Sequence, residues 1–223
     1  MKTPVTSQRL RDHFTYSWWK YSLLVILAFM GWSILYAVTA YQPPEEKKVI
    51  LGVYSTGSET NAAAYMQEVQ RVHMPDMEAV EPMYILPDQQ YGDMILLTRV
   101  AAGDCDLYVL PGTQFQNWAG QGACQPLDEV APELINELEI AGVSLSRGRR
   151  LNSKTDEKHI YGIPCRDLPG AAHLLGMSDV SDMYICVFHK TGNDENVLKF
   201  LSIFVHDLMN EPPTTPTDLA PAQ

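Results

Sequence analysis

An uncharged apolar run of 21 residues constrains this chain more than any other feature of its sequence. The run extends from Tyr21 to Tyr41 and contains no Asp, Glu, Lys or Arg. About 20 such residues in an α-helix, rising about 1.5 Å each, span the roughly 30 Å hydrocarbon layer of a membrane. Trp18 and Trp19 lie at one end and Tyr41 at the other, which is typical of aromatic residues at the two interfaces. We therefore predict a transmembrane anchor over residues 18–41.

Charge is distributed unevenly on the two sides of this run. Residues 1–20 carry a net charge of +3, whereas residues 42–223 carry −14. Because basic flanks stay on the cytoplasmic side, we predict a single-pass cell-membrane protein with residues 1–17 in the cytoplasm and the acidic bulk outside. A cleaved signal peptide is the alternative, since Val38-Thr39-Ala40 resembles a cleavage site, although the run exceeds the usual core of about 7–15 residues. The overall charge of −11 argues against a nucleic-acid partner, because phosphate neutralisation needs a basic face.

The exported part divides by composition into three segments. Residues 42–48 are polar and contain proline, which predicts a short stalk. Residues 49–209 have the apolar patterning of one α/β domain. Residues 210–223 hold four Pro and three Thr, which predicts a disordered tail.

Strand and helix patterns alternate through the first half of the predicted domain. Short continuous apolar runs predict buried strands, and apolar residues at helical spacing predict helices. In chain order we expect a strand at 49–54, a helix at 61–72, a strand at 77–86, a helix at 91–102, a strand at 106–110 and a helix at 113–119. This alternation predicts an α/β fold with a mostly parallel sheet. Pro82 indicates that the second strand lies at a sheet edge or contains a bulge.

The second half of the domain is less regular. A helix is predicted at 132–141, strands at 159–164 and 183–189, and a helix at 194–209 whose apolar stripe is Val197, Leu201, Phe204 and Leu208. The polar, basic segment 144–158 reads as a solvated loop or, alternatively, as a docking patch. In the earlier helix at 91–102, one apolar face holds Met94, Leu97, Val100 and Ala101, and Gly103 is suited to end that helix.

Motifs that carry enzyme chemistry are absent from the sequence. It contains no GxSxG, HExxH, GxxxxGKS or GxGxxG, and its six histidines never fall at metal-ligand spacing. We therefore predict a protein that is not an enzyme and has no catalytic residue, metal or cofactor. The four cysteines can form disulfides outside the cell or stay free and buried, and none forms a CxxC pair; they are Cys105, Cys124, Cys165 and Cys186.

Several short segments resemble one bacterial family. The segment Arg99–Leu110 (RVAAGDCDLYVL), followed by Gln125–Asp128 (QPLD) and Tyr161–Pro164 (YGIP), is similar to extracellular solute-binding proteins of ABC importers, the sugar-binding type especially. Cys186–Leu208 resembles the segment by which that family returns to its first lobe. Family members insert a second lobe after the YGIP-like strand, whereas here only the 18 residues Cys165–Asp182 intervene. The resemblance therefore implies one lobe of a periplasmic-binding-protein-like fold, with the other lobe missing.

Two functions follow from this resemblance. The first is binding of a carbohydrate or small polar solute for import, with a membrane permease as partner. The second is a membrane-tethered interaction module that no longer binds solute, or that receives its second lobe from a partner chain. In open α/β sheets, ligands bind beyond the carboxyl ends of the strands. That rule, with a ring on which a sugar can stack, gives as ligand-binding candidates Ser55, Thr56, Gly57, Ser58, Pro111, Gly112, Thr113, Gln114 and Trp118. Helix capping by the Ser/Thr turn and core packing of Trp118 are the alternatives.

Overall fold

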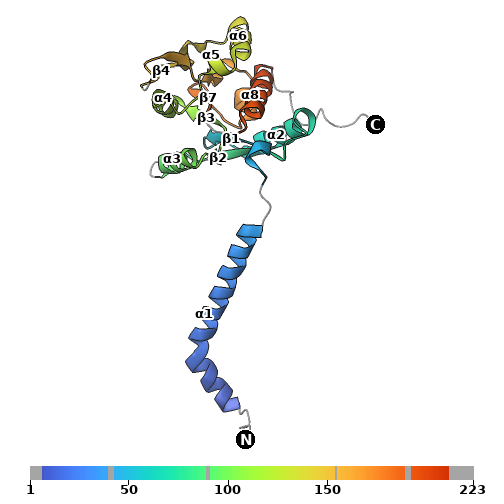
Figure 1. Cartoon of the computed structure of the whole chain (residues 1–223), viewed down its shortest axis with the longest axis vertical. Helices are drawn as coiled ribbons and strands as arrows, with labels where there is room; N and C mark the ends of the chain where they lie inside the picture. The colour runs from blue at the N-terminus through green and yellow to red at the C-terminus, as the bar shows by residue number, and fades with distance from the viewer. Residues whose placement is uncertain (1–6, 40–42, 89–90, 154, 189–191, 211–223) are drawn as a thin grey trace, which may run out of the picture. The chain divides into compact units, whose positions relative to one another are not determined.

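The computed structural model describes residues 7–39, 43–88, 91–153, 155–188 and 192–210 of the 223-residue chain. Its contacts divide the chain into two compact units, residues 1–42 and residues 43–223. The described part of the first unit is one helix, and all the described strands belong to the second (Figure 1).

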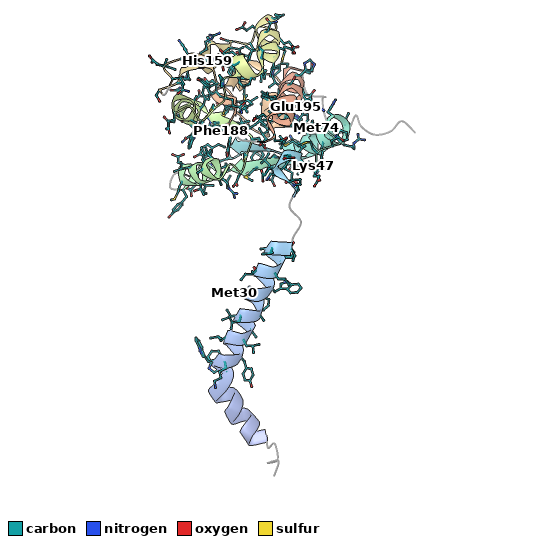
Figure 2. The ribbon with its side chains drawn as sticks, in the orientation of Figure 1. Met30, Lys47, Met74, His159, Phe188 and Glu195 are labelled. Carbon is teal, nitrogen blue, oxygen red and sulfur yellow. The ribbon has the colours of Figure 1, made fainter. Side chains whose placement is uncertain are left out.

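The first unit consists of α1 (Ser7–Thr39), a helix of 33 residues. Its part Trp18–Thr39 comprises 22 residues, is long and apolar enough to cross a membrane, and is not buried. Side chains such as that of Met30 project outward from the helix (Figure 2). An apolar helix with no protein packed around it is a candidate membrane anchor or signal sequence.

A five-stranded sheet forms the centre of the second unit, with the strand order β2-β1-β3-β7-β6. The strands are β1 (Lys48–Tyr54), β2 (Ala79–Ile85), β3 (Leu107–Pro111), β6 (Ile163–Pro164) and β7 (Met183–Val187). β1 pairs in parallel with both β2 and β3, while β7 is antiparallel to β3 and to β6. Four of the five strands therefore run the same way, and the sheet is mostly parallel as predicted. Pro82 lies in β2, which is an edge strand.

Helices cover both faces of this sheet and create two apolar layers. On one face, α2 (Glu59–His73) and α8 (Asp194–Met209) pack on alternate strand residues such as Leu51 and Val109. On the other, α3 (Gly92–Ala102) and α4 (Gly112–Gly120) pack on Tyr108 and its neighbours. The alternation follows from the strand geometry, in which successive side chains point to opposite faces. Shorter elements complete the unit: η1 (Glu45–Lys47), α5 (Leu127–Val130), α6 (Pro132–Ile140), η2 (Leu145–Gly148), η3 (Cys165–Asp167) and α7 (Ala171–Leu174).

Helix ends and stripes follow the sequence closely. α8 has the predicted bounds, and its stripe from Val197 to Leu208 is buried. Gly103 ends α3 with a φ of 68°, the left-handed conformation that favours glycine. Ser58 is the N-cap of α2, where its hydroxyl accepts a hydrogen bond from the Thr60 N–H.

The basic segment 144–158 is more ordered than a solvated loop. It contains η2, and β4 (Arg149–Leu151) pairs antiparallel with β5 (Lys158–Ile160) in a separate two-stranded sheet. The strand predicted at 159–164 is also two strands, β5 and β6, which belong to different sheets. β4 and β5 pair locally, within residues 149–160, whereas β6 pairs with β7 at 183–187. The residue types in these short segments do not indicate the strand with which each one pairs. Of the predicted tail at 210–223, only Asn210 is among the described residues.

The stalk predicted at 42–48 contacts the domain over its last residues. η1 follows Pro44, and the backbone carbonyl of Lys47 accepts a hydrogen bond of 2.8 Å from the Glu78 N–H. The ammonium of Lys47 also lies 3.1 Å from the Glu78 carboxylate. Residues 45–48 are thus part of the folded unit, because β1 begins at Lys48.

Candidate functional site

The turns that the sequence singled out follow the carboxyl ends of β1 and β3. Ser55–Ser58 come directly after β1, and Pro111–Gln114 lead from β3 into α4. Ser55 and Gly112 are buried, Gly57, Pro111 and Gln114 are half-buried, and Thr56, Ser58 and Thr113 are exposed. The Ser55 hydroxyl accepts a hydrogen bond of 3.0 Å from the Gly57 N–H, so it stabilises the turn itself.

Asp93 of α3 links the end of β1 to the start of α4. Its Oδ1 accepts a hydrogen bond of 2.7 Å from the hydroxyl of Tyr54, the last residue of β1. The same oxygen accepts a second hydrogen bond, also of 2.7 Å, from Nε2 of Gln114. Burial and the neighbouring carboxylate of Asp93 raise the pKa of Tyr54 to about 12, so the hydroxyl stays protonated and remains a donor. The amide of Gln114 is therefore engaged within the protein.

The segment 175–182 of the same chain covers both turns. The Ser58 N–H donates a hydrogen bond of 3.1 Å to the carbonyl oxygen of Gly176, and the Gly112 N–H donates one of 2.8 Å to that of Asp182. Gly57 has no room for a side chain, since a Cβ there would lie 2.9 Å from the Gly176 carbonyl oxygen. Two backbone donors at this edge, the N–H groups of Ser58 and Gly112, are thus used by the chain itself.

Trp118 packs within the domain. It lies on α4, is half-buried, and its ring meets the Phe188 ring edge-on with 6.0 Å between centroids. Its indole nitrogen is buried without a hydrogen-bond partner among the described residues. Of the two roles considered from the sequence, sugar stacking and core packing, these contacts correspond to core packing.

The four cysteines are free and buried. Burial raises the pKa of the Cys105 thiol to about 11 and that of Cys165 to about 12. The thiol of Cys186 also has a raised pKa, chiefly through burial, and donates to the backbone carbonyl of Tyr108 at 3.4 Å. Protonated, inaccessible thiols are poor nucleophiles and poor metal ligands. Among the described residues, no group of three or more His, Cys, Asp or Glu side chains could hold a metal ion.

Helix α3 has an apolar outer surface that the sequence pattern did not reveal. Its buried residues are Gly92 and Leu96, whereas Met94 and Leu97, which the sequence placed on one apolar face, are 58% and 53% exposed. Eight large apolar side chains are exposed among the described residues of the second unit. Five of them, here called the α3 patch, are clustered on α3 or just before it: Leu86, Tyr91, Met94, Ile95 and Leu97. The uninterrupted apolar run MILL at 94–97 could have indicated this surface. A helix that is apolar on all sides is normally buried on all sides, so an exposed side indicates a surface that another molecule covers.

A groove runs along the outer side of α3. It has a volume of about 490 Å³ and is lined by Tyr91, Met94, Ile95, Thr98, Arg99 and Asp104. The Arg99 guanidinium lies 2.7 Å from the Asp104 carboxylate, so the groove has apolar walls and an ion pair among its lining residues.

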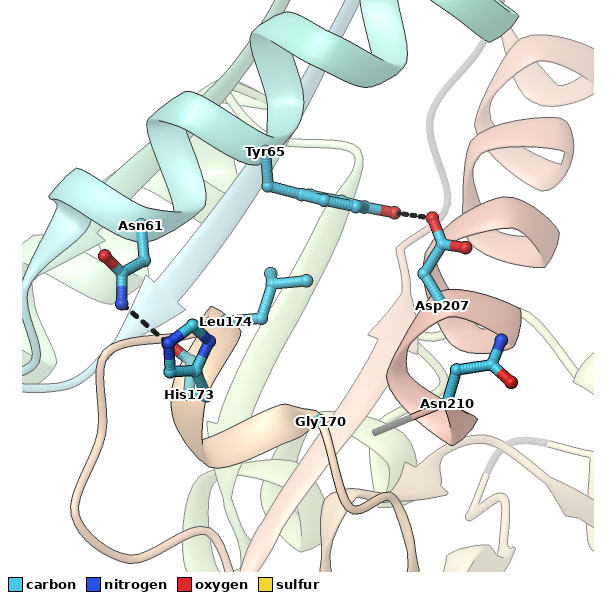
Figure 3. Close-up of a pocket in the computed structure, with 7 residues that line it drawn as sticks. All are labelled: Asn61, Tyr65, Gly170, His173, Leu174, Asp207 and Asn210. Carbon is cyan, nitrogen blue, oxygen red and sulfur yellow. Dashed lines mark hydrogen bonds between the residues drawn. The ribbon is translucent and has the colours of Figure 1, made fainter. Parts of the chain in front are cut away.

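A second hollow lies between α2, α7 and α8 (Figure 3). Its volume is about 320 Å³, and it is lined by Asn61, Tyr65, Gly170, His173, Leu174, Asp207 and Asn210. Figure 3 shows the Tyr65 side chain extending from α2 toward Asp207 on α8, to which its hydroxyl donates a hydrogen bond of 2.7 Å. On the other side, the Asn61 amide donates to the His173 carbonyl oxygen at 3.0 Å. None of these residues was a candidate from the sequence, because α2 lies more than 100 residues before α7 and α8 in the chain.

The chain has a weak structural likeness to a protein of known structure. No family model and no curated protein sequence matches this chain. Among solved structures, it is similar to an extracellular solute-binding protein family 1 from Alicyclobacillus acidocaldarius subsp. acidocaldarius DSM 446, with a TM-score of 0.38 and 18% sequence identity. The match covers 56% of this chain and 28% of the solved one. At this level of likeness, no function is transferred from the solved protein to this chain.

Proposed function

We propose that this protein is a single-pass membrane protein whose extracytoplasmic domain, resembling one lobe of a solute-binding protein, binds a protein partner through the α3 patch. The observation that carries the proposal is the concentration of exposed apolar side chains on α3. Contiguous apolar patches of this kind are rare on the free surface of soluble domains and are typical of interaction sites.

The geometry of the α3 patch favours a protein as its occupant. Tyr91, Met94, Ile95 and Thr98 line one groove and recur at the i, i+3, i+4, i+7 spacing of one helix face. Such a row accepts the ridge of another helix, as in helix–helix packing. Because residues 42–223 carry a net charge of −14, a partner with basic residues around an apolar stripe complements this domain best.

The length of the tether supports a partner at the same membrane. Only five residues, 40–44, separate Thr39, the end of α1, from Glu45, the start of η1. Five fully extended residues span at most about 18 Å. A domain held on so short a tether meets membrane proteins at a high effective concentration.

Coverage of the strand-end turns argues against solute capture as the main function. Segment 175–182 uses the N–H groups of Ser58 and Gly112, and Gln114 is held by Asp93. A small-molecule site encloses most of its ligand's surface. Sugar binding is therefore a weaker proposal than partner binding. Its site would consist of Ser55–Ser58, Pro111–Gln114 and Trp118.

Photo-crosslinking tests the partner proposal. A photoreactive phenylalanine analogue placed at Met94 of the full chain, irradiated in native membranes, is expected to give one discrete adduct with a second protein, identified by mass spectrometry. The matched control carries the analogue at Glu137, an exposed position on α6, and should give no such adduct. An Ile95→Glu substitution should remove the Met94 adduct. Adducts only with lipid or with a second copy of this chain would contradict the proposal.

Two further measurements test the rest of this assignment. Protease added to intact cells or spheroplasts should digest residues 43–210 and leave a small anchor fragment, whereas a released protein beginning at Tyr41 would show a cleaved signal peptide instead. Thermal-shift measurements with neutral sugars should give no stabilisation. A sugar that stabilises the protein, with the effect abolished by Trp118→Ala, would favour solute binding over the interaction module.

A further inference from the structure

The hollow between α2, α7 and α8 has the features of a small-molecule site that is independent of the α3 patch. It lies on the opposite face of the sheet from α3, since α2 and α8 belong to the other apolar layer. Its volume of about 320 Å³ falls at the lower end of the range for small-molecule sites, about 300–1,000 Å³. The size suits a ligand of a few carbon atoms with one polar group.

Charge in the hollow comes from Asp207. No Lys or Arg is among the residues that line it. The Tyr65 hydroxyl binds Oδ2 of Asp207, and among the described residues Oδ1 has no hydrogen-bond partner. Burial raises the pKa of Tyr65, and the hydrogen bond to Asp207 raises it further, so this hydroxyl is a donor and not a second anion. The lining thus offers one carboxylate oxygen to a positively charged group, and its only basic side chain is the imidazole of His173.

The walls beside this carboxylate are apolar. Figure 3 shows the Tyr65 side chain on one side of the hollow and the Leu174 side chain beside it. Two contacts to α8 hold the Tyr65 ring: the hydrogen bond to Asp207 and a tilted contact with Phe204, 6.0 Å between centroids. An aromatic ring beside a carboxylate favours an organic cation, because the ring face attracts positive charge and the apolar surface accepts its carbon atoms.

Gly170 brings the two sides of the hollow together. Its N–H donates a hydrogen bond of 2.9 Å to the Leu208 carbonyl oxygen near the end of α8. A Cβ at this position would lie 3.0 Å from the Asn210 carbonyl oxygen and 3.1 Å from that of Leu208. The chain before α7 therefore approaches the end of α8 closely, which fixes the separation between Leu174 and Asp207.

We propose that this hollow binds a small organic ammonium ion. The ammonium group would donate to Oδ1 of Asp207, and the carbon chain would lie between the Tyr65 ring and Leu174. The acidic net charge of the domain, −14 over residues 42–223, draws cations toward its surface.

Three probes with four carbon atoms each test the charge preference on the full chain in a neutral detergent. They are n-butylammonium chloride, sodium butyrate and n-butanol, each at matched ionic strength. Butylammonium is expected to raise the melting temperature saturably with a millimolar dissociation constant, because a ligand that binds only the folded state stabilises it. Butyrate and butanol should bind at least tenfold more weakly. Equal effects of butylammonium and butyrate would overturn the proposal.

Substitutions assign the effect to this hollow. Asp207→Asn should weaken butylammonium binding at least tenfold, whereas the matched control Glu195→Gln removes one exposed charge near the other end of the same helix and should change it less than twofold. Tyr65→Phe keeps the ring and should retain binding within about threefold. If Asp207→Asn lowers stability without ligand, calorimetry at a temperature where it is folded still gives its affinity. Butylammonium binding that is unchanged in Asp207→Asn would overturn the proposal and leave the α3 assignment intact.

Discussion

The backbone N–H of Gly112 donates a 2.8 Å hydrogen bond to the carbonyl oxygen of Asp182, and a Cβ on Gly112 would lie 2.5 Å from that residue's carboxylate. The first residue of α4 is thus held against the segment that precedes β7. Together with the Ser58–Gly176 hydrogen bond, this contact closes the edge of the sheet where open α/β folds bind ligands.

The contact between Gly176 and Ser58 should contribute strongly to stability. Gly176 has a φ of 61°, and a Cβ there would overlap the backbone carbonyl of Ser58. Gly176→Ala therefore has two costs: alanine must adopt the left-handed backbone conformation, and its Cβ clashes with the backbone of Ser58. We expect this substitution to lower the free energy of unfolding by about 3 kcal/mol or more. Gly103 is the matched control, since its φ is 68° and no atom lies within 4 Å of its Cβ position. Gly103→Ala should cost only about 1 kcal/mol in urea unfolding. Equal losses in the two variants would show that segment 175–182 does not pack tightly on the turn.

Neighbouring residues of α3 should respond oppositely to substitution. Leu96 is 1% exposed and Ile95 is 45% exposed. Leu96→Ala leaves a cavity in the core and should cost about 2–5 kcal/mol. Ile95→Glu should change the unfolding free energy by less, about 1 kcal/mol or below in the isolated protein, because nearly half of this residue is already exposed to water. Urea unfolding measures both, and a large loss in Ile95→Glu would mean that the outer side of α3 is covered by this chain itself.

Stability should depend on pH through His159. Burial lowers the pKa of this residue, but the hydrogen bond with Asp128 and the charges of Asp128, Glu129 and Glu157 raise it by more, so that it stands above the ordinary 6.5. Its Nδ1 lies 3.1 Å from Asp128, and its Nε2 lies 3.5 Å from Glu129 and 3.8 Å from Glu157. Because the pKa of His159 is higher in the folded state than in the unfolded state, its protonation stabilises the fold. This stabilisation is fully present at pH values below the unfolded-state pKa, and it is lost as the pH rises through the folded-state pKa.

The matched comparison is His159→Gln against His206→Gln, an exposed histidine on α8. Urea midpoints between pH 5 and pH 8.5 should show that His159→Gln loses part of the extra stability of the acidic range, whereas His206→Gln retains the wild-type profile. A wild-type profile that persists in His159→Gln would contradict the role of these carboxylates.

The thiols should be unreactive until the domain unfolds. All four cysteines are buried, and burial raises the pKa of Cys105 to about 11 and that of Cys165 to about 12. An aromatic disulfide reagent at pH 8 should therefore detect close to no thiol in the folded protein and four after denaturation in urea. Two thiols or none after denaturation, in protein isolated without reductant, would show that disulfides form in this domain.

The local sequence determines those parts of the fold in which neighbours along the chain decide the outcome. The stripe from Val197 to Leu208 specifies α8, and Gly103 specifies the end of α3, because helical periodicity and left-handed caps are short-range properties. The alternation of strands and helices over 49–119 likewise specifies the parallel pairing of β1 with β3. The uncharged run from Tyr21 to Tyr41 identifies the apolar helix by its length alone.

Only the tertiary structure decides which surfaces are covered. Segment 175–182 packs on turns that lie far from it in sequence, and this covers the site that the sequence predicted beyond the carboxyl ends of the strands. In α3 both sides are apolar, so periodicity could not indicate that Leu96 is buried and Met94 is exposed. The hollow between α2, α7 and α8 depends on Tyr65 meeting Asp207 across 142 residues. Contacts at such separation arise from packing of the whole domain, and their free energy leaves no periodic pattern in the sequence around either residue.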